Sequence, residues 1–520
     1  FKRNKEESAL AKEMTKNAKK QKEEKTTEKK DKLPELKIDF NNLEDRIARL
    51  TINSSNLGDA ILTNDANKLF YMSRFEGGYD LWVRDLKEGS TRILSKLNSR
   101  YASLEMDKEG KNIYMLSGGR LSKIDVNSGK VTPLPFNAEL ELQKAAERQY
   151  IYEHAWRQVK DKFYDPDLHQ LDWNFYKKAY ERFLPHINNN YDFADLLSEL
   201  LGELNASHTG ARYFGTYSKT QTASLGAFYD SEYKGNGLKI EEIIEKGPLV
   251  SADTKIKAGT IIEKINQQEI KAGEDYFQLL QNLAGKRVLL SLYDPTTKVR
   301  WEEYVKPISS RQENALLYKR WVKQRKVLVD KLSQGRIGYI HVKAMNSQSF
   351  REVFSELLGR YRNREAIIID TRSNGGGWLH EVLLTLLSGN IYAQFVPRGQ
   401  YIGRDPLFQW AKPSAVIMSE DNYSNAHGFP WAYKEMKLGK LVGMPVPGTM
   451  TAVWWELQQD PTLVFGIPQV GMKDNQGRYL ENLQLEPDIK VNNDPANAIK
   501  GRDLQVEATV KALLEDLDNK

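Results

Sequence analysis

A run of three isoleucines that leads into three consecutive glycines constrains the fold of this chain more than any other feature. Ile367, Ile368 and Ile369 fit a strand that is covered on both faces, because a continuous branched apolar run leaves no polar face for solvent. The glycines at 375–377 would let backbone N–H groups approach something negatively charged at the end of that strand. The anion could be a phosphate or a transient oxyanion, and a plain tight turn is the alternative to both.

Length and composition set the scale of the molecule. The chain has 520 residues and a mass of 59.7 kDa, which predicts about three or four domains. Its 40% hydrophobic and 28% charged residues are typical of a globular protein, and no apolar run approaches the roughly 20 residues of a membrane span. The absence of cysteine excludes disulfides, thiol catalysis and thiolate metal sites. Because the chain begins with Phe1 rather than Met, we expect its native N-terminus to be missing.

The positive charge of the chain is concentrated at one end. Residues 1–32 hold twelve basic and seven acidic side chains, so five of the six net positive charges lie there and the remainder is close to neutral. The acidic residues are interspersed, and no aromatic ladder accompanies the basic ones. Residues 1–33 therefore predict a charged linker rather than a binding arm, and we expect no nucleic-acid partner.

A repeated unit marks the next part of the chain. Residues 34–139 alternate short apolar segments with turn residues, which predicts β-sheet. Within them residues 68–72 resemble residues 111–115, and residues 85–89 resemble residues 125–129, at offsets of 43 and 40 residues. Such a period is typical of β-propeller blades. Two blades are too few to close a ring, so we expect the remnant of a longer propeller, with a small β-meander as the alternative.

Residues 140–220 have the helical spacing of apolar and aromatic positions that predicts a helical subdomain. Ser207 and His208 stand at its end, beside Gly210, where helix gives way to strand. An imidazole at such a place can face a cleft, although a lone histidine is more often structural.

Residues 221–310 resemble a PDZ domain, a module that binds peptide ends by adding a strand to a sheet edge. Gly237 and Leu238 would form its carboxylate-binding loop, and a helical pattern near residues 276–283 would line its groove. A purely structural role for this module is the alternative reading of the same pattern.

Strands alternate with helices over residues 311–495, which predicts an α/β core with a largely parallel sheet, and residues 496–520 predict a C-terminal helix. Ligands of such sheets bind at the carboxyl ends of the strands, where the glycine triplet lies. A second strand, residues 414–418, leads through a short turn to Ser424 and then to another helix. This geometry exposes a nucleophilic hydroxyl beside free helix amides.

Several spaced motifs in one order give the chain a family resemblance. They are Asp370-Thr371-Arg372-Ser373-Asn374-Gly375-Gly376-Gly377, Ser424 with Phe429-Pro430, residues 438–443, and Glu481 followed by Pro487-Asp488. Over residues 34–500 they resemble the tricorn protease branch of the tail-specific, or C-terminal-processing, serine peptidases. The resemblance implies a multidomain fold of α/β and β parts: propeller blades, helical subdomain, PDZ-like domain and an α/β serine-peptidase core.

The resemblance also assigns roles to residues of this chain. It implies that Ser424 is the nucleophile and His208 the general base, and that Ser207 and Glu481 form the relay that orients the imidazole. The chemistry agrees, because a serine hydroxyl needs a base within about 3 Å and that base needs an acceptor that fixes its tautomer.

The oxyanion of a tetrahedral intermediate needs two hydrogen-bond donors. We assign them to the backbone N–H groups of Gly376, in preference to Gly377, and of Asn425, the residue after the nucleophile. Asn425 departs from the aspartate of archaeal tricorn-like enzymes, and asparagine should be tolerated because the donor is backbone. Thr449 stands 25 residues past Ser424, where the Ser-Lys branch carries its lysine, which favours the Ser-His branch.

Further polar side chains near these motifs have other candidate roles. His427, three residues from Ser424, is the rival base, although no clear orienting carboxylate lies near it in sequence. Asp370 and Arg372 are expected to form a structural pair that supports the glycine loop. Gln484 replaces the glycine usual in the motif that begins at Glu481. The histidines show no metal-ligand spacing, so we expect no metal.

The sequence thus predicts a serine peptidase that cleaves peptides or unfolded polypeptides through an acyl-enzyme, without a cofactor. The alternatives are a catalytically silent PDZ and propeller scaffold that binds peptides, and a phosphate or nucleotide binder, which would lack the lysine of a phosphate loop. The resemblance implies a homo-oligomer, trimer or hexamer, without a membrane span. It suggests a cytoplasmic location, or a periplasmic one if the missing N-terminus carried an export signal. Cleavage specificity stays open, because the residue that sets it in the family falls within residues 390–412, where the sequence alone does not identify its counterpart.

Overall fold

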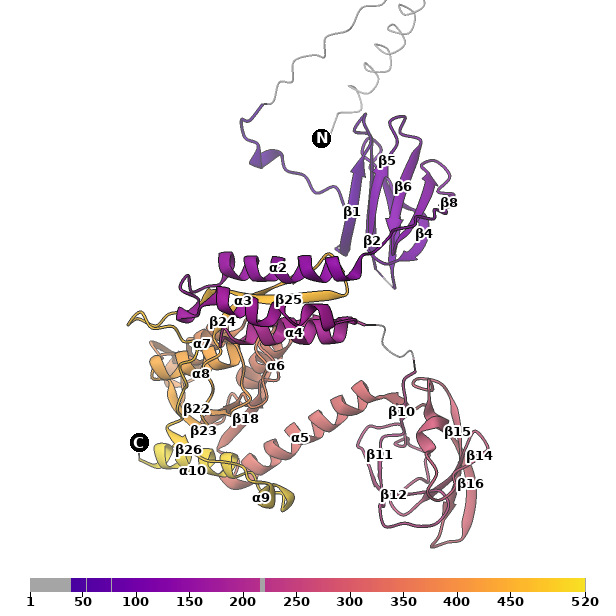
Figure 1. The fold of residues 1–520 in the computed structure, drawn as a ribbon. Helices are drawn as coiled ribbons and strands as arrows, with labels where there is room; N and C mark the ends of the chain where they lie inside the picture. Colours follow the sequence, from indigo (N-terminus) through magenta and orange to yellow (C-terminus); the bar gives the residue numbers. More distant parts are fainter. Residues whose placement is uncertain (1–38, 53, 76, 216–219, 520) are drawn as a thin grey trace, which may run out of the picture. The chain divides into compact units, whose positions relative to one another are not determined.

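The computed structural model describes residues 39–52, 54–75, 77–215 and 220–519 (Figure 1). The chain divides into two compact units, Phe1–Glu141 and Leu142–Lys520. The charged linker expected in residues 1–33 lies outside the described residues.

The first unit consists of two four-stranded antiparallel sheets, in each of which consecutive strands pair. The two sheets share one core, which includes Phe70, Met72, Leu81, Ile113 and Ile124. The prediction of sheet in this part of the chain is confirmed. The strands are β1 (Asn56–Leu62), β2 (Lys68–Arg74), β3 (Tyr79–Asp85) and β4 (Thr91–Ser99) in one sheet, and β5 (Ala102–Met106), β6 (Asn112–Ser117), β7 (Arg120–Asp125) and β8 (Val131–Leu134) in the other; a short 3-10 turn, η1 (Glu44–Arg46), precedes them.

The sequence repeat marks equivalent turns of the two sheets. Asp85 ends the third strand of the first sheet and accepts hydrogen bonds from the backbone N–H groups of Lys87 and Glu88, both at 2.9 Å. Asp125 ends the third strand of the second sheet and accepts from the N–H of Ser128 at 2.7 Å. The repeat therefore records the same aspartate-closed turn twice.

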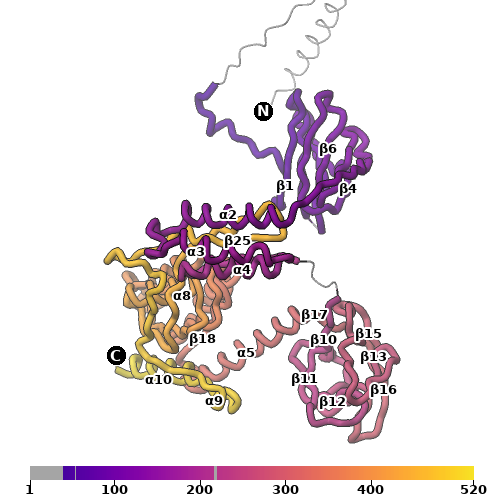
Figure 2. The backbone as a smooth tube through the Cα atoms, in the orientation of Figure 1, coloured from indigo at the N-terminus to yellow at the C-terminus, as the bar shows by residue number. Residues whose placement is uncertain are grey.

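The second unit begins with three helices that pack on a three-stranded sheet. The helices are α2 (Lys144–Lys162), α3 (Trp173–Glu181) and α4 (Asn190–Gly202), with the short turns η2 (Leu168–Gln170) and η3 (Leu184–His186). The sheet has the order β24-β25-β9, from Thr451–Leu457, Leu463–Gly471 and Gly210–Tyr213. Figure 2 shows β25 lying between α2 and α4, where its Phe465 and Ile467 join the helical core. A hairpin from the predicted α/β core thus completes the predicted helical subdomain.

The PDZ-like segment forms a sheet with the order β11-β12-β13-β15-β16, to which β14 adds beside β13. Its strands are β11 (Ala227–Tyr229), β12 (Leu238–Ile243), β13 (Ile261–Ile265), β14 (Gln268–Glu269), β15 (Val288–Asp294) and β16 (Val299–Val305), and a separate pair joins β10 (Ala223–Ser224) to β17 (Ile308–Ser309). The helix expected over residues 276–283 is only a five-residue 3-10 turn, η4 (Tyr276–Leu280).

In the expected carboxylate-binding loop of this segment, a backbone N–H is already hydrogen-bonded within the segment. The backbone N–H of Gly237 donates to the carbonyl of Ile270 at 2.8 Å. Leu238 begins β12, which pairs with β11 on one side and β13 on the other. The pairing with β11 covers Ile240 to Ile243 and the pairing with β13 covers Leu238 and Lys239, so a peptide-binding role of Gly237 and Leu238 stays a prediction.

The catalytic-core prediction of a parallel sheet is confirmed. Five strands in the order β18-β19-β22-β23-β26 run parallel throughout, from Ile337–His341, Ala366–Asp370, Ser414–Met418, Gly439–Gly443 and Ile489–Lys490. The isoleucine run lies in β19, whose five residues are all buried, as a strand covered on both faces requires.

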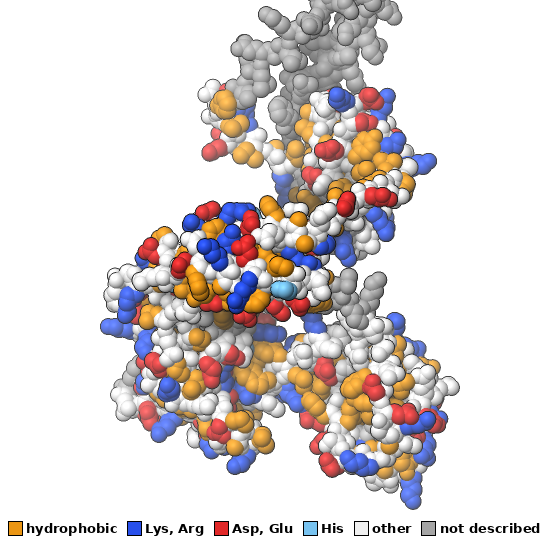
Figure 3. All heavy atoms as spheres, viewed as in Figure 1, with side chains coloured by type: hydrophobic (Ala, Val, Ile, Leu, Met, Phe, Trp, Pro, Cys, Tyr) orange, Lys and Arg blue, Asp and Glu red, His pale blue; other side chains and the backbone are white. Residues whose placement is uncertain are grey.

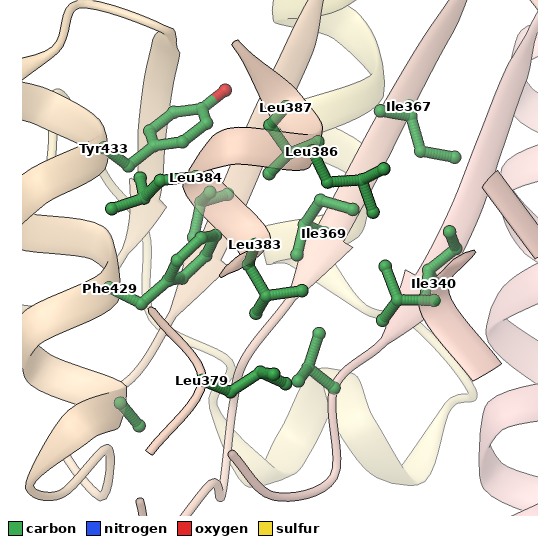
Figure 4. Close-up of a cluster of buried hydrophobic side chains, with 14 of the residues drawn as sticks. Ile340, Ile367, Ile369, Leu379, Leu383, Leu384, Leu386, Leu387, Phe429 and Tyr433 are labelled. Atoms are coloured by element: carbon green, nitrogen blue, oxygen red, sulfur yellow. The ribbon is translucent and has the colours of Figure 1, made fainter. Parts of the chain in front are cut away.

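Helices cover both faces of this sheet. One face carries α6 (Ser347–Ser355), continued by the π-turn η5 (Glu356–Arg360), together with α7 (His380–Leu387) and α8 (Asn425–Glu435). The other face carries α5 (Ser310–Ser333) and α10 (Leu504–Asp518), after the short helix α9 (Pro495–Ile499). Figure 4 shows the four leucines of α7 at 383, 384, 386 and 387 between Phe429 and Tyr433 of α8 on one side and Ile367 and Ile369 of β19 on the other. A small ribbon, β20 (Ala393–Phe395) and β21 (Gly403–Asp405), brackets the turn η6 (Pro397–Gly399) between α7 and β22.

The expected pairing of Asp370 and Arg372 is confirmed. The guanidinium of Arg372 donates to Asp370 Oδ2 at 2.6 Å and to Asp503 Oδ1 at 3.0 Å, and all three side chains are buried. Because Asp503 caps the start of α10, this pair ties the strand before the glycine loop to the last helix.

Charges of both signs cover the surface. Basic and acidic side chains alternate over the face drawn in Figure 3, consistent with the near-neutral balance of the chain beyond its first residues. Among the helices of the described residues, none is long and apolar enough to cross a membrane.

Candidate active site

Ser424 occupies a strained turn between β22 and α8. Its backbone has φ 57° and ψ −124°, a region that non-glycine residues rarely enter and that stores about 1–3 kcal/mol. Its backbone N–H donates to Thr449 Oγ1 at 3.0 Å, which helps to hold this conformation. A half-buried serine on a sharp strand-to-helix turn is the arrangement that presents a nucleophilic hydroxyl.

Ser207, His208 and Glu481 form a connected relay. The hydroxyl of Ser207 lies 2.8 Å from His208 Nδ1 and donates to Glu481 Oε2 at 3.0 Å, while the backbone N–H of Ser207 donates to Glu481 Oε1 at 2.5 Å. A hydroxyl has one proton, so its donation to Glu481 requires that Nδ1 carry a proton and donate to Ser207 Oγ. The Nε2 atom is then unprotonated, which is the tautomer a general base needs.

The relay lies beside the turn that carries Ser424. The backbone N–H of His208 donates to the hydroxyl of Tyr423 at 2.6 Å, and the two rings lie 4.7 Å apart between centroids. No hydrogen bond joins His208 Nε2 to Ser424 Oγ within the described part of the chain. Catalytic hydrogen bonds often form or shorten only when substrate binds. The absence of this bond is therefore compatible with His208 as the base for Ser424.

Half-buried His208 and buried Glu481 have shifted pKa values. Burial lowers the pKa of His208 to about 4, so the ring is neutral near pH 7 and available as a base. Burial also raises the pKa of Glu481, against the two hydrogen bonds from Ser207, which act in the opposite direction. Thr451 adds a second acceptor, since its Oγ1 lies 3.1 Å from His208 Nδ1.

The glycine triplet does meet the turn that carries Ser424. Gly376 has φ 95°, and a Cβ on it would lie 2.7 Å from Ser424 Cβ and 2.7 Å from the carbonyl oxygen of Tyr423. Only glycine allows the strand end to approach the serine this closely.

The N–H of Gly376, which the sequence analysis assigned as an oxyanion donor, already has an acceptor in this structure. Its N–H donates to Asn374 Oδ1 at 2.9 Å, and Asn374 is fully buried and anchored by a bond from its Nδ2 to the carbonyl of Val342 at 2.8 Å. The neighbouring N–H of Gly377 and the N–H of Asn425, the first residue of α8, have no acceptor among the described residues. Sequence reasoning missed this because an asparagine before glycines reads as an ordinary turn residue.

Asn425 has a side-chain role that the sequence did not reveal. Its Oδ1 accepts from the backbone N–H groups of Leu379 and His380 at 2.8 and 3.0 Å, and its Nδ2 donates to His380 Nδ1 at 2.7 Å. The buried amide therefore joins the start of α7 to the start of α8. An aspartate could accept the two N–H groups but could not donate to a neutral imidazole, and burial lowers the pKa of His380.

His427 is placed as a structural group rather than as the rival base. Its ring is fully buried, and its Nδ1 accepts from the backbone N–H of Thr449 at 3.3 Å. A neutral ring that accepts at Nδ1 carries its proton on Nε2, which then cannot take a proton from Ser424. That Nε2 has no hydrogen-bond partner among the described residues, and burial lowers the pKa of His427 to about 4.

Two family models match parts of the chain. The model described as peptidase family S41 matches residues 336–491, and the model described as tricorn protease C1 domain matches residues 144–202. A crystal structure of the tricorn protease superposes with a TM-score of 0.78 at 18% identity, over 93% of this chain and 48% of that chain. The chain is thus similar to tricorn-like peptidases of family S41.

Curated relatives of this family extend the match beyond the two models. A protein of Sulfurisphaera tokodaii named as a Tricorn-like protease C-terminal subunit is 25% identical over 518 residues, covering 93% of this chain and 58% of its own length. A Tricorn protease homolog of Saccharolobus solfataricus is 24% identical, covering 84% of this chain and 42% of its own length. The chain thus spans about half the length of the relatives it matches.

The S41 segment of this chain contains the glycine loop, Ser424, Thr449 and Glu481, while Ser207 and His208 lie outside both matched segments. The fold brings the two parts together through the shared sheet β24-β25-β9, which places the end of α4 beside the loop that carries Glu481. Among the described residues, no group of three or more acidic or histidine side chains could hold a metal ion.

Proposed function

We propose that this chain hydrolyses peptide bonds through an acyl-enzyme on Ser424, with His208 as the general base. The observation that carries the proposal is the relay from His208 through Ser207 to Glu481, assembled from segments 274 residues apart beside a strained serine turn. A histidine with a purely structural role needs no such combination of a buried carboxylate, a hydroxyl between that carboxylate and the ring, and a second serine beside the ring. The match to the peptidase family S41 model supports a serine peptidase.

The proposed reaction follows from the protonation states of the relay. His208 Nε2 closes on Ser424 Oγ and removes its proton as the oxygen attacks the carbonyl carbon of the substrate. The imidazolium is stabilised through Ser207 by the carboxylate of Glu481, and it returns the proton to the leaving amine. In the second half of the reaction, His208 removes a proton from water as it attacks the ester carbonyl. The ring then returns this proton to Ser424 Oγ, and the acid product leaves.

The oxyanion would be held by backbone amides at the meeting point of α8 and the glycine loop. We assign one donor to the N–H of Asn425, which lies at the start of α8. The second donor comes from the glycine loop: Gly377 offers a free N–H, whereas Gly376 could serve only if Asn374 Oδ1 released it. Anchoring of Asn374 by Val342 favours Gly377.

The surrounding parts suit a peptidase of peptides or unfolded polypeptides. We propose that the two antiparallel meanders of the first unit are propeller blades and that residues 221–310 are a PDZ-like domain with a structural role, since β12 pairs with strands on both sides. A homo-oligomeric assembly is part of the proposal on the strength of the family resemblance. No cofactor enters the mechanism.

Labelling and turnover together test the proposal. Wild-type protein should react covalently with a fluorophosphonate probe at Ser424, identified by peptide mass mapping, and should cleave a fluorogenic peptide library. Ser424→Ala should abolish both signals, and His208→Ala should slow both by at least about 1000-fold. Labelling that survives in Ser424→Ala, or a wild type that neither labels nor cleaves, would favour a silent peptide-binding scaffold instead.

A further inference from the structure

A second concave site lies in the α/β core, away from the serine turn. It is a cavity of about 530 Å³ between the end of η5, the ribbon strand β21 and the segment that leads into β22. Leu357 and Trp410, which are 0% and 2% exposed, contribute its apolar wall, and Tyr401 and Leu407 contribute an exposed apolar rim. The volume falls in the range of about 300–1,000 Å³ that is usual for small-molecule sites.

The charged groups of this cavity all have one sign. Arg362, Arg404 and Lys412 line it, and no acidic side chain of the described residues does. Neither guanidinium has an ion pair within the described part of the chain. The ammonium of Lys412 donates to the carbonyl oxygens of Arg362 and Arg364, at 2.8 and 2.5 Å, and lies 5.2 Å from the centre of the Trp410 ring. These two bonds use two of its three protons.

The three cations repel one another in a partly desolvated place. Burial lowers the pKa of Lys412, and the charges of Arg404 and Arg362 lower it further. Glu365 acts in the opposite direction, but its carboxylate is already paired with Arg336 at 3.0 Å. An anion in the cavity would relieve this repulsion, and guanidinium groups bind carboxylate and phosphate oxygens in pairs.

We propose that this pocket binds a small amphipathic anion, a carboxylate or phosphate carried on an aromatic or branched aliphatic group. The anionic end would face Arg362, Arg404 and Lys412, and the apolar end would lie against Leu357 and Trp410.

The position of the pocket separates it from catalysis. The residues that line it precede β19 and β22, so they lie at the amino ends of these parallel strands. The glycine loop and Ser424 follow the carboxyl ends of the same strands. The pocket is therefore a second site of the core, and its occupation does not require a free Ser424.

Calorimetric titration of the full chain tests the proposal with defined probes. We expect 3-phenylpropionate or phenyl phosphate to bind, and the stronger of the two identifies the anionic group that the site prefers. The neutral 3-phenylpropan-1-ol, which lacks the anion, and inorganic phosphate, which lacks the apolar group, should each bind at least about tenfold more weakly. Equal binding of the neutral alcohol would overturn the proposal.

Single substitutions then locate the site. Arg404→Gln and Arg362→Gln should each weaken binding about tenfold, since a charged hydrogen bond contributes on this scale. Arg362 is exposed, so its variant should fold normally. Arg351→Gln on the exposed face of α6 makes the same charge change and should leave binding unchanged. An equal loss in Arg351→Gln, or loss of binding after fluorophosphonate labelling, would refute a separate site.

Discussion

Replacing Glu481 by glutamine should cost far more activity than removing the Ser207 hydroxyl, although Ser207 stands between Glu481 and the imidazole. Both oxygens of Glu481 accept from Ser207, one from the backbone N–H and one from the hydroxyl. A glutamine has one carbonyl oxygen and one NH₂ group. The backbone N–H can only donate, so the carbonyl must face it and the NH₂ must face the hydroxyl. Ser207 Oγ then accepts from this NH₂ group and gives its own proton to His208 Nδ1.

This reversal places the ring proton of His208 on Nε2, where it blocks the removal of a proton from Ser424. A substitution that fixes the wrong tautomer in a serine protease lowers kcat about 10⁴-fold. We therefore expect Glu481→Gln to lower kcat/KM about 10³- to 10⁴-fold, or about 4 to 5.5 kcal/mol of transition-state stabilisation.

Ser207→Ala should be milder because Thr451 offers a substitute. Thr451 Oγ1 lies 3.1 Å from His208 Nδ1 and donates to the carbonyl of Ser207, so it can accept the Nδ1 proton and keep the productive tautomer. We expect a loss of about 10- to 100-fold, or about 1.4 to 2.8 kcal/mol. Adding Thr451→Val should bring the double variant close to Glu481→Gln.

The assay is kcat/KM for a fluorogenic peptide together with the rate of fluorophosphonate labelling, with thermal melting to show that each variant is folded. Glu486→Gln, an exposed carboxylate in the same loop, is the control for loss of charge. If Ser207→Ala is as impaired as Glu481→Gln, Thr451 does not replace the Ser207 hydroxyl as the acceptor for His208 Nδ1. A Glu481→Gln enzyme within tenfold of wild type would refute the relay itself.

Three further predictions address the loops around Ser424 and a buried ring. Gly376→Ala should lower kcat/KM at least about 100-fold because its Cβ would lie 2.7 Å from Ser424 Cβ, whereas Gly375→Ala, whose Cβ meets nothing within 4 Å, should behave as wild type; equal losses would contradict this. Thr449→Val should cost activity about 10-fold by leaving the Ser424 N–H without its acceptor, while Thr449→Ser should retain activity in the same peptide assay. Burial lowers the pKa of His427 to about 4, so between about pH 6.5 and pH 4 the unfolded ring binds more protons and stability falls as pH falls, by up to about 3 kcal/mol. His427→Asn keeps an acceptor for Thr449 but does not titrate, so its melting temperature should fall less than that of wild type over this range, and parallel curves would argue against the buried neutral ring.

The sequence was informative where one pattern has one physical solution. Ile367 to Ile369 fit a strand covered on both faces, and alternation with helices predicts a parallel sheet, which the structure confirms. The pairing of Asp370 with Arg372 followed from the same reasoning, since buried charges need partners.

The sequence was uninformative where a hydrogen bond between distant segments decides the outcome. Nothing in the pattern around Gly237 shows that its N–H is taken by Ile270, or that β12 has strands on both sides. The hairpin β24-β25 joins the helical subdomain through pairing with β9, which depends on tertiary contacts rather than on local propensity. The role of Thr449 as the acceptor for the Ser424 N–H appears only in the structure.

Three neutral amides, together with Asp421, which accepts from the N–H and the hydroxyl of Ser373, hold the loops at the carboxyl ends of β19 and β22. Asn374 fixes the glycine loop, Asn422 donates to Thr371 Oγ1 at 2.9 Å between the two strand ends, and Asn425 ties α7 to α8; all three are buried. A buried amide can donate and accept at once, and it does so without the desolvation cost of a charge. It also adds no net field beside the place where an oxyanion would form, so the backbone N–H groups there would determine the local electrostatics.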